Sequence, residues 1–290
     1  MHPHRAAALQ VSAEHPMIPT FTRIERMTSS LLVTDNNGIR EISLNRPSVH
    51  NAFDDRLIAE LTSAIAETGE DDSIWALVLS GQGSTFSAGA DANWMRAMAG
   101  ASESANREDS LRLARLMRTL NFLPKPTIAK VNGSAYGGGI GLIACCDVAI
   151  GVEGAKFSLS EAKLGLVPAV ISPYVVAAVG PRHARKLFIS AEVFDAEEAL
   201  RINLLHQLVA PSQLTDAVSR SLHFLSKCGA HAQAEAKALA LRIAGLTRES
   251  AEQLDQENAA LIARLRVSDE GQEGLSAFLD KRPPRWISGN

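Results

Sequence analysis

The chain has 290 residues, of which 46% are hydrophobic and 21% are charged, and its formal net charge is −3. A chain of this length can bury a large core and form one large domain, or one domain with a subdomain. The small negative charge gives no electrostatic reason to bind nucleic acid or an anionic membrane surface. No apolar run approaches the roughly 20 residues that span a bilayer.

The cysteines are few and unevenly spaced: Cys145 and Cys146 are adjacent, and Cys228 stands alone. An odd number with one adjacent pair is not a disulfide framework, which favours a reducing, cytoplasmic location. No spacing of cysteine and histidine resembles a zinc site, so no metal site is predicted. The adjacent cysteines lie in an apolar segment and are expected in the core.

The pattern along the chain predicts an α/β fold. Residues 1–27 lack the continuous apolar core of a secretory signal and are predicted to be a disordered extension. Residues 30–44 predict a β-hairpin, because two alternating apolar runs flank an Asn-Gly turn. The next expected elements are a helix at 54–70, strands at 75–81, 125–133 and 147–153, and a helix at 103–123.

After about residue 182 the apolar spacing is helical throughout. Successive helices are expected at 182–190, 195–203, 211–227, 231–245, 250–266 and 271–280. The chain is therefore predicted to have an α/β core over residues 28–210 and a helical region over residues 211–290. A helical region with so many apolar positions either folds over the core or packs against other subunits.

Two glycine-rich loops each lie between an expected strand and an expected helix. The segment "SAYGGGIGLIACC" (134–146) follows one strand, and "GQGSTFSAGADANWM" (81–95) follows another. The first N–H groups of a helix lack partners, and glycine lets an oxygen atom approach them closely. Such glycines also permit tight packing of a helix on a strand. Two loops of this kind can aim one N–H each at a single oxygen and so form an oxyanion hole.

A single acidic residue, Glu161, lies in the largely apolar and small-residue segment "AKFSLSEAKLGLVPAV" (155–170). A carboxyl group in such surroundings has a raised pKa, which suits proton transfer near neutral pH. The alternative interpretation is a surface glutamate that pairs with Lys163.

Four segments resemble the enoyl-CoA hydratase/isomerase (crotonase) family: "NRPSVHNAF", "FSAGADANWM", "VNGSAYGGGIGLIACCDVAI" and "FSLSEAKLGLVP". The resemblance covers roughly residues 30–285. It implies a crotonase-like spiral of ββα turns followed by a C-terminal helical trimerisation region, assembled as a homotrimer or as a hexamer of two trimers. It also implies an acyl-CoA substrate, in which coenzyme A is part of the substrate, and no separate cofactor.

The resemblance also assigns roles to particular residues. The N–H groups of Ala90 and Gly138 would stabilise an enolate at the thioester oxygen, and Glu161 would transfer protons. Residues 90–93 would lie along the coenzyme A arm, with Asp91 also capping a helix. Phe278 and Lys281 would reach the coenzyme A of a neighbouring subunit, and the alternative is a core-packed phenylalanine beside a solvated lysine. The full set expected to contact substrate is Ala90, Asp91, Ala92, Asn93, Gly138, Gly141, Ala169, Phe278 and Lys281.

One position departs from the family's pattern. Hydratases of this family usually carry a further glutamate three residues after the donor glycine, where this chain has Gly141. Hydration with one carboxylate requires that the substrate or backbone groups, such as the N–H of Ala169, hold the water. Double-bond isomerisation needs only one base. A hydratase, an isomerase that uses Glu161 alone and a non-catalytic acyl-CoA-binding paralogue therefore all stay open.

A finer resemblance favours hydration. The segments "GLIACCDVAI" and "SEAKLGLVPAVISPYVV" are similar to the bacterial methylglutaconyl-CoA hydratase branch of the family. Substrates of that branch are branched and carry a distal carboxylate, which a nearby cation or hydrogen-bond donor would bind. The sequence does not identify that partner. The resulting prediction is a hydratase of a 2-enoyl-CoA, with a branched acyl chain.

Overall fold

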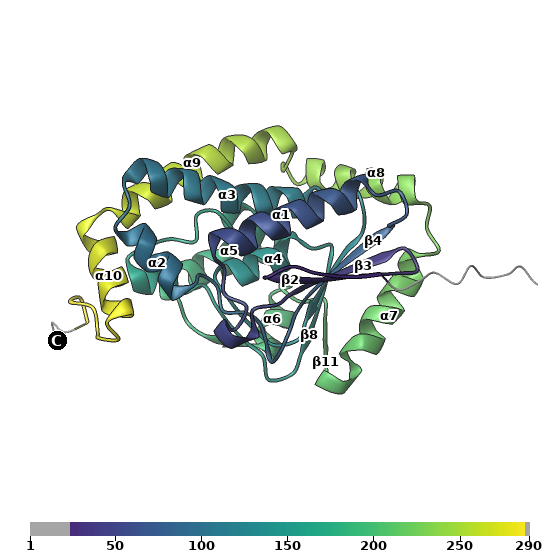
Figure 1. Ribbon diagram of the computed structural model, residues 1–290, viewed down its shortest axis with the longest axis horizontal. Helices are drawn as coiled ribbons and strands as arrows, with labels where there is room; N and C mark the ends of the chain where they lie inside the picture. The colour runs from purple at the N-terminus through teal and green to yellow at the C-terminus, as the bar shows by residue number, and fades with distance from the viewer. Residues whose placement is uncertain (1–23, 288–290) are drawn as a thin grey trace, which may run out of the picture.

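The computed structural model describes residues 24–287, and its centre is a twisted seven-stranded sheet (Figure 1). The strands run in the order β1-β2-β3-β4-β6-β8-β11. From β3 onward neighbouring strands are parallel, and β1, β2 and β3 are antiparallel to one another. The bounds are β1 Ile24–Met27, β2 Leu31–Asn36, β3 Ile39–Leu44, β4 Ala76–Gly81, β6 Thr127–Val131, β8 Val148–Val152 and β11 Gln207–Val209.

A second sheet of four very short strands lies in the order β10-β9-β7-β5. Its strands are β5 Thr85–Ser87, β7 Ser134–Tyr136, β9 Lys156–Ser158 and β10 Phe194–Asp195. The chain visits the large sheet, then the small sheet, then a helical segment, and repeats this three times from β4 to α5. The predicted α/β class and the spiral of ββα turns are thus confirmed.

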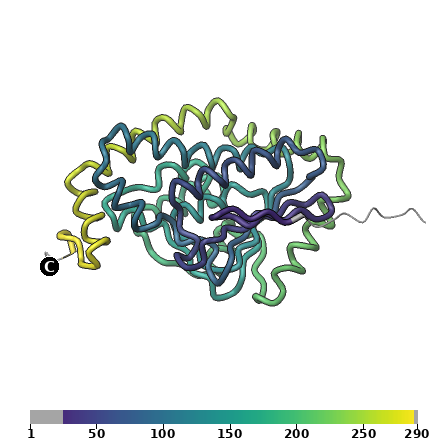
Figure 2. The backbone as a smooth tube through the Cα atoms, in the orientation of Figure 1, coloured from purple at the N-terminus to yellow at the C-terminus, as the bar shows by residue number. Residues whose placement is uncertain are grey.

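Helices cover both faces of the large sheet, and α3 and α9 lie side by side along one of them (Figure 1). Figure 2 shows the chain of α9 passing over the molecule and turning down into α10 at one end. Three short 3-10 helices are η1 Pro47–Val49, η2 Ser160–Leu164 and η3 Pro211–Gln213. The α-helices are α1 Asp55–Glu70, α2 Ala92–Ala99, α3 Glu103–Asn121, α4 Gly138–Cys145, α5 Ser172–Ser190, α6 Ala196–Arg201, α7 Leu214–Leu225, α8 Ala230–Ile243, α9 Arg248–Arg266 and α10 Asp269–Leu279.

Local sequence signals explain several of these boundaries. The β2–β3 hairpin turns at Asn37 and Gly38, which both have positive φ, as an Asn-Gly turn requires. Helix α1 begins after Asp54, whose carboxylate accepts a hydrogen bond from the N–H of Leu57 at 2.8 Å. Both Cys145 and Cys146 are buried in the core, as expected.

The structure differs from the sequence expectations in several elements, among them strand β11 at Gln207–Val209, which pairs with β8 where only helices were expected. Ile24–Met27, which the predicted extension included, form strand β1 against β2, and Arg26 lies 3.8 Å from Asp35. Residues 1–23 lie outside the described part of the chain. Helix α5 is interrupted at Gly180, whose φ of +75° and ψ of 157° are not helical. Its second part corresponds to the helix expected at 182–190, whereas the first part, from Ser172, was not expected.

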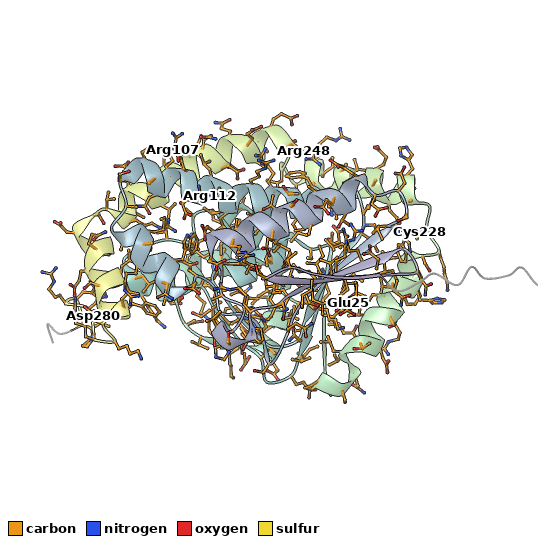
Figure 3. All side chains as sticks on the ribbon, in the orientation of Figure 1. Glu25, Arg107, Arg112, Cys228, Arg248 and Asp280 are labelled. Atoms are coloured by element: carbon orange, nitrogen blue, oxygen red, sulfur yellow. The ribbon has the colours of Figure 1, made fainter. Side chains whose placement is uncertain are left out.

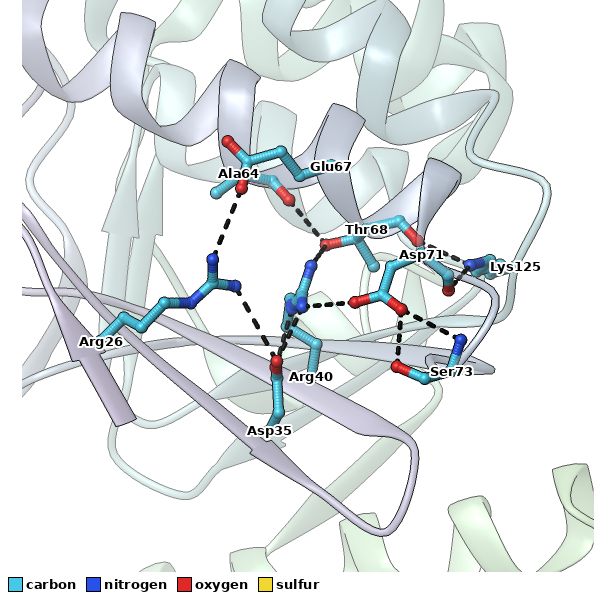
Figure 4. Close-up of polar contacts among 9 residues, drawn as sticks. All are labelled: Arg26, Asp35, Arg40, Ala64, Glu67, Thr68, Asp71, Ser73 and Lys125. Carbon is cyan, nitrogen blue, oxygen red and sulfur yellow. Dashed lines mark hydrogen bonds and ion pairs between the residues drawn. The ribbon is translucent and has the colours of Figure 1, made fainter. Parts of the chain in front are cut away.

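A buried arginine fastens the N-terminal hairpin to α1 (Figure 4). Arg40 is 3% exposed, and its guanidinium binds Asp35 with two hydrogen bonds of 2.7 Å and Asp71 with one of 3.0 Å. Lys125 donates to the backbone carbonyls of Thr68 and Asp71 at the same end of α1. Because the buried charge has its partners, this network stabilises the hairpin without leaving an orphaned ion.

Candidate active site

A cavity of about 420 Å³ lies between the two glycine-rich loops, η2 and the helices α2, α3, α9 and α10. Its wall is mainly apolar and includes Phe53, Leu113 and Ile262. An apolar cavity with a few polar groups aimed into it is the usual form of a small-molecule site. No other part of the described chain combines such a cavity with two glycine-rich loops.

The two glycine-rich loops leave the small sheet side by side. Strands β5 and β7 are parallel neighbours, with Ser87 opposite Ala135. Further along, a Cβ atom on Gly89 would lie 3.0 Å from the carbonyl oxygen of Tyr136, so the two backbones touch at that point. The loops therefore present the residues that follow, Ala90 and Gly138, to the same cavity, and both residues line it.

The N–H groups of Ala90 and Gly138 have no hydrogen-bond partner in the described chain. On one side of Ala90, the N–H of Phe53 donates to Gly89 and the carbonyl of Phe53 accepts from Asp91, so the N–H of Ala90 is left out of this pairing. Gly138 is the first residue of α4, where N–H groups lack helical partners. Two unpartnered donors in one cavity can stabilise an oxyanion.

All three consecutive glycines have a steric reason to be glycine, and a Cβ on Gly139 would lie 2.9 Å from the Cβ of Ser87. A Cβ on Gly138 would lie 2.5 Å from the Cε2 atom of Phe53. Gly137 has a φ of +48°, and a Cβ there would lie 3.1 Å from the Oε1 atom of Glu161. The sequence analysis did not single out Gly137, whose backbone brings the carboxyl group of Glu161 against the donor loop.

Glu161 lies in η2, and its carboxyl group is sealed inside the protein. The residue as a whole is half-buried, but its Oε2 atom is inaccessible and has no hydrogen-bond partner. Burial raises the pKa of Glu161 to about 7, and a hydrogen bond from its own backbone opposes the rise. The pairing with Lys163, which the alternative interpretation of the sequence requires, is absent from the described contacts. The side chain is therefore able to take up and release a proton near neutral pH.

Gly141, which the sequence predicted to contact substrate, is not among the residues that line the cavity. It is buried, and a Cβ on it would lie 2.4 Å from Cγ2 of Ile171 and 3.1 Å from Cε of Met117. The volume into which a side chain at 141 would extend is thus filled by Ile171. Where a glutamate at position 141 would place its side chain, this protein has the apolar side chain of Ile171.

Ala169 and Phe278 line the cavity, but the N–H of Ala169 is not free. It donates to the carbonyl of Val167 at 2.8 Å, so it has no proton left to offer a water. In this structure the N–H is thus used in the tight turn through Pro168. Phe278 is 49% exposed and lines the cavity of its own chain.

Besides Gly141, four expected contact residues lie outside this cavity. Asp91 caps α2 through the N–H groups of Asn93 and Trp94, as predicted, and also binds Arg46 at 3.1 Å. With exposed Asn93 it lines an adjacent hollow of about 370 Å³. Exposed Ala92 and Lys281, which lies in the turn after α10, line neither space.

A second carboxylate lines the cavity, and the sequence analysis missed it. Asp109 on α3 is fully buried, and it accepts hydrogen bonds from Trp94 at 3.2 Å, Arg112 at 3.0 Å and Arg266 at 3.1 Å. The guanidinium of Arg266 also lies 5.8 Å from the ring centre of Trp94. Within residues 24–287 no helix is long and apolar enough to cross a membrane.

The sequence and the fold resemble those of known proteins. The profile of the enoyl-CoA hydratase/isomerase family matches residues 34–289. 2,3-Dehydroadipyl-CoA hydratase of Escherichia coli (strain K12) is 34% identical over 262 residues, covering 88% of this chain and 98% of that protein. Crotonyl-CoA hydratase of Syntrophomonas wolfei is 31% identical over 266 residues, covering 89% and 98%. The crystal structure of an enoyl-CoA hydratase from Shewanella pealeana is 42% identical, with a TM-score of 0.72, covering 89% of this chain and 96% of that one.

Proposed function

The chain belongs to the enoyl-CoA hydratase/isomerase family, and we propose that it adds water to a 2-enoyl-CoA thioester in the cavity between the two glycine-rich loops. The observation that carries the proposal is the position of the Glu161 carboxyl group. It lies against Gly137, and the next residue in the chain is Gly138, whose N–H has no partner. A group that transfers protons near pH 7 thus lies beside donors that stabilise an oxyanion. The names of the two hydratases above support this reaction.

The reaction uses Glu161 twice. The ionised carboxylate takes a proton from water while the water oxygen bonds to C3 of the enoyl group. The electrons of the C2=C3 double bond move toward the thioester carbonyl and form an enolate. The enolate oxygen accepts hydrogen bonds from the N–H groups of Ala90 and Gly138. C2 then takes the proton from Glu161, which regenerates the carboxylate. The sum is the addition of one water, with no separate cofactor or metal.

The water is held by Glu161 and the substrate. Neither Gly141 nor Ala169 holds the water, because Gly141 has no side chain and the N–H of Ala169 already donates to Val167. Asp109 is a poor proton carrier because three donors from Trp94 and two arginines bind its oxygens. The chemistry therefore depends on one carboxyl group.

A second candidate reaction, double-bond isomerisation, is favoured by the contact between Gly141 and Ile171. An isomerase moves one proton between two carbons and needs only Glu161. The two reactions give products of different mass. Crotonyl-CoA and a 3-enoyl-CoA are incubated separately with the protein, and each product is weighed. Hydration adds the mass of one water to crotonyl-CoA, whereas isomerisation leaves the mass of the 3-enoyl-CoA unchanged.

Two outcomes of this experiment contradict hydration. If neither crotonyl-CoA nor a branched 2-enoyl-CoA gains the mass of water, the protein is not a hydratase of these esters. If both esters bind but no variant at Glu161 changes any rate above the assay background, the chain is a non-catalytic acyl-CoA-binding protein. A gain of mass that Glu161→Gln abolishes supports the proposal.

We also propose a class of acyl chain, an assembly and a cellular location for this protein. The acyl chain is branched, which the resemblance to the methylglutaconyl-CoA hydratase branch supports, and Val170 and Ile171 give the cavity a bulky apolar wall. The chain forms trimers, or hexamers of two trimers, through its C-terminal helices. Large apolar side chains on α7 and α8 support association, since Phe224, Leu239 and Ile243 are 69%, 49% and 78% exposed. The unpaired cysteines support a cytoplasmic location.

A further inference from the structure

We infer that Gly274 is a positioning residue for this reaction, and that it acts through the backbone of Leu164 to hold the Glu161 carboxyl group away from bulk water. The inference rests on the proposed function, in which Glu161 transfers the protons. Gly274 lies in α10 and is not among the residues that line the cavity. It acts instead on the 3-10 helix η2, which carries Glu161.

Helix η2 is poorly anchored by its own side chains. None of its residues, Ser160–Leu164, is buried. A 3-10 helix also has poorer hydrogen-bond geometry than an α-helix. The main contacts of η2 with other elements are with α5 and α10. The position of Glu161 therefore depends on how these two helices pack against η2.

Helix α10 meets η2 backbone to backbone at two buried glycines. A Cβ on Gly274 would lie 2.8 Å from the Cα atom of Leu164 and closer still to its carbonyl group. A Cβ on Gly165, the residue after η2, would lie 2.6 Å from the carbonyl oxygen of Glu270. Such distances are about 1 Å shorter than a normal contact between carbon atoms. A side chain at position 274 would therefore move α10 and η2 apart.

The other small residues of α10 show where glycine is required. Gly271, one turn earlier, packs on the end of α9, where a Cβ would overlap the carbonyl group of Leu265. Ala277, one turn after Gly274 on the same face, is 1% exposed and yet has room for its Cβ. Glycine is thus needed only where α10 meets another backbone, at α9 for Gly271 and at η2 for Gly274.

Helix α10 is fixed at its other contacts. The carboxylate of Glu273, which is 8% exposed, accepts hydrogen bonds from Arg282 at 2.6 Å and 3.0 Å and from the N–H of Arg285 at 2.9 Å. These bonds fold the segment after α10 back onto the helix. In Figure 3, Asp280, the first residue after α10, lies at one end of the molecule. Because α10 is held by this segment and by α9, a Cβ at position 274 would displace η2.

The line of contact between α10 and η2 borders the cavity. Leu275 and Phe278 of α10 line the cavity, and so do Glu161 and Leu164 of η2. A wider gap between the two helices would admit bulk water beside Glu161, whose Oε2 atom is now inaccessible. Water solvates a carboxylate better than a carboxylic acid, so its entry would lower the pKa of Glu161.

Burial, and not a neighbouring charge, sets the pKa of Glu161 at about 7. The first half of α5, residues 172–179, carries no charged side chain. The charged residues on the cavity wall and on the part of α10 that meets η2 are Asp109, Lys163, Arg266, Glu270 and Glu273. None of these contributes to the shift, which comes from burial and is opposed by the backbone of Glu161 itself. The pKa of Glu161 therefore reports how well the carboxyl group is sealed.

The test is the pH profile of water addition to crotonyl-CoA. We measure kcat/KM from pH 4 to 9 for the parent protein and for Gly274→Ala, at pH values where both are folded. The midpoint of the variant should lie below that of the parent by about one pH unit or more, because water stabilises the ionised carboxylate. At pH 8, where Glu161 is ionised in both proteins, kcat of the variant should fall by about tenfold, since the carboxylate is misplaced.

Gly151→Ala is the matched control. Gly151 is a buried glycine of β8, a strand that does not line the cavity, and a Cβ there would lie 2.6 Å from Cδ1 of Leu205. This variant also adds one methyl group to a crowded interior, so it should lower stability and leave the midpoint unchanged.

Gly165→Asn separates α10 from η2 at the second glycine. Asparagine tolerates the φ of +67° at this position. The variant leaves the sequence of α10 intact and should lower the midpoint in the same direction as Gly274→Ala. If Gly274→Ala does not fold, Gly165→Asn decides the question in its place.

The outcomes separate this inference from the proposed function. If the parent hydrates neither crotonyl-CoA nor a branched 2-enoyl-CoA, the proposed function fails. If the parent is a hydratase with a midpoint near 4.5, Glu161 is not sealed and the inference alone is overturned. The same holds if Gly274→Ala and Gly165→Asn keep the midpoint of the parent, or if Gly151→Ala moves it as far. A lower midpoint in the first two variants, with Gly151→Ala unchanged, supports the inference.

Discussion

Two buried carboxylates line the same cavity, and the protein treats them in opposite ways. Asp109 on the α3 wall accepts from a tryptophan and two arginines, all at 3.2 Å or less. Glu161 lies on the short 3-10 helix η2, and its Oε2 atom has no hydrogen-bond partner. Both groups are removed from water, so the difference lies in their hydrogen bonds and in the charges beside them.

The contrast separates structural from chemical use of a buried acid. An acid with charged donors is held as an anion and links the elements that carry those donors. An acid without them has a high pKa, costs free energy when ionised, and exchanges its proton readily near neutral pH. Glu161 is the second kind, since burial raises its pKa to about 7. The five predictions below test this difference, from the largest expected effect to the smallest.

The first prediction is that Glu161→Gln lowers kcat by about a thousandfold, because the amide cannot carry the proton that general acid–base catalysis requires. The measurement is the rate of water addition to crotonyl-CoA. Ser160→Ala, at the neighbouring cavity residue, is the control and should keep the rate within about threefold. A Glu161→Gln rate within tenfold of the parent would remove Glu161 from the mechanism.

The second prediction concerns the oxyanion donors. Gly138→Pro deletes one N–H, and the rate should fall by about a hundredfold to a thousandfold. Proline is tolerated at the first position of a helix, which Gly138 occupies. The matched control is Gly138→Ala, which makes the same close contact with Phe53 but keeps the N–H.

The decisive quantity is the ratio of the two Gly138 variants. If Gly138→Ala and Gly138→Pro lose the same activity, the loss comes from the contact with Phe53 and the N–H has no role. If the alanine variant is at least tenfold faster than the proline variant, the N–H stabilises the reacting oxygen.

The third prediction is a change in stability with pH. The pKa of Glu161 is about 7 in the folded protein and lies at its ordinary value of 4.5 when unfolded. Between these values the folded state binds more protons, so this group lowers the free energy of unfolding as the pH rises. Glu161→Gln should therefore match the parent near pH 4.5 and exceed its stability at pH 8 by up to about 3 kcal/mol.

Denaturant unfolding at fixed protein concentration measures this effect at the two pH values. Asp109→Asn serves as the opposite case, because it breaks buried ion pairs and should destabilise the protein at both. A stability difference between parent and Glu161→Gln that is the same at pH 4.5 and pH 8 would mean that folding does not shift the pKa of Glu161.

The fourth prediction is the pH dependence of the reaction. Water addition begins with ionised Glu161, so kcat/KM should be level above pH 8 and fall by about tenfold for each pH unit below about 7. Initial rates with crotonyl-CoA from pH 5 to 9 measure the profile. A midpoint near pH 4.5 would place the carboxyl group in water rather than in the cavity.

The sequence predicted the reacting side of the cavity better than the opposite side. Each glycine-rich loop follows a strand and precedes a helix, so the two loops could be recognised from local pattern, and the resemblance to the family then named Ala90 and Gly138 within them. Glu161 stood out as a lone acid in an apolar segment. These signals each lie within about 20 residues of chain, which is the range over which periodicity and turn chemistry can be recognised.

The opposite wall is made by tertiary contact. Asp109 and Arg266 are 157 positions apart, and each is one of many charged residues on an amphipathic helix. Only the packing of α9 on α3 shows that they meet. The small sheet was missed for a different reason, because strands of two or three residues are too short for alternation to show.

The fifth prediction asks why the reacting wall has only one carboxylate. Gly141→Glu alone should destabilise the protein by about 1–3 kcal/mol, because its Cβ would meet Ile171 at 2.4 Å. Ile171→Gly removes the Cγ2 and Cβ atoms of Ile171, which a Cβ at position 141 would meet at 2.4 Å and 3.0 Å. The two changes together should therefore cost about 1 kcal/mol less than the sum of the single effects, as coupled neighbours do.

Denaturant unfolding of the parent, the two single variants and the double variant gives this coupling energy. A control cycle uses Val170→Gly, at the neighbouring cavity residue, in place of Ile171→Gly. In that cycle the changes in the free energy of unfolding should be additive. Strict additivity in the Ile171 cycle would show that the space above Gly141 is not what Ile171 occupies. A favourable coupling would mean that the loss of a second carboxylate and the gain of an apolar wall are one change, made at two positions that touch.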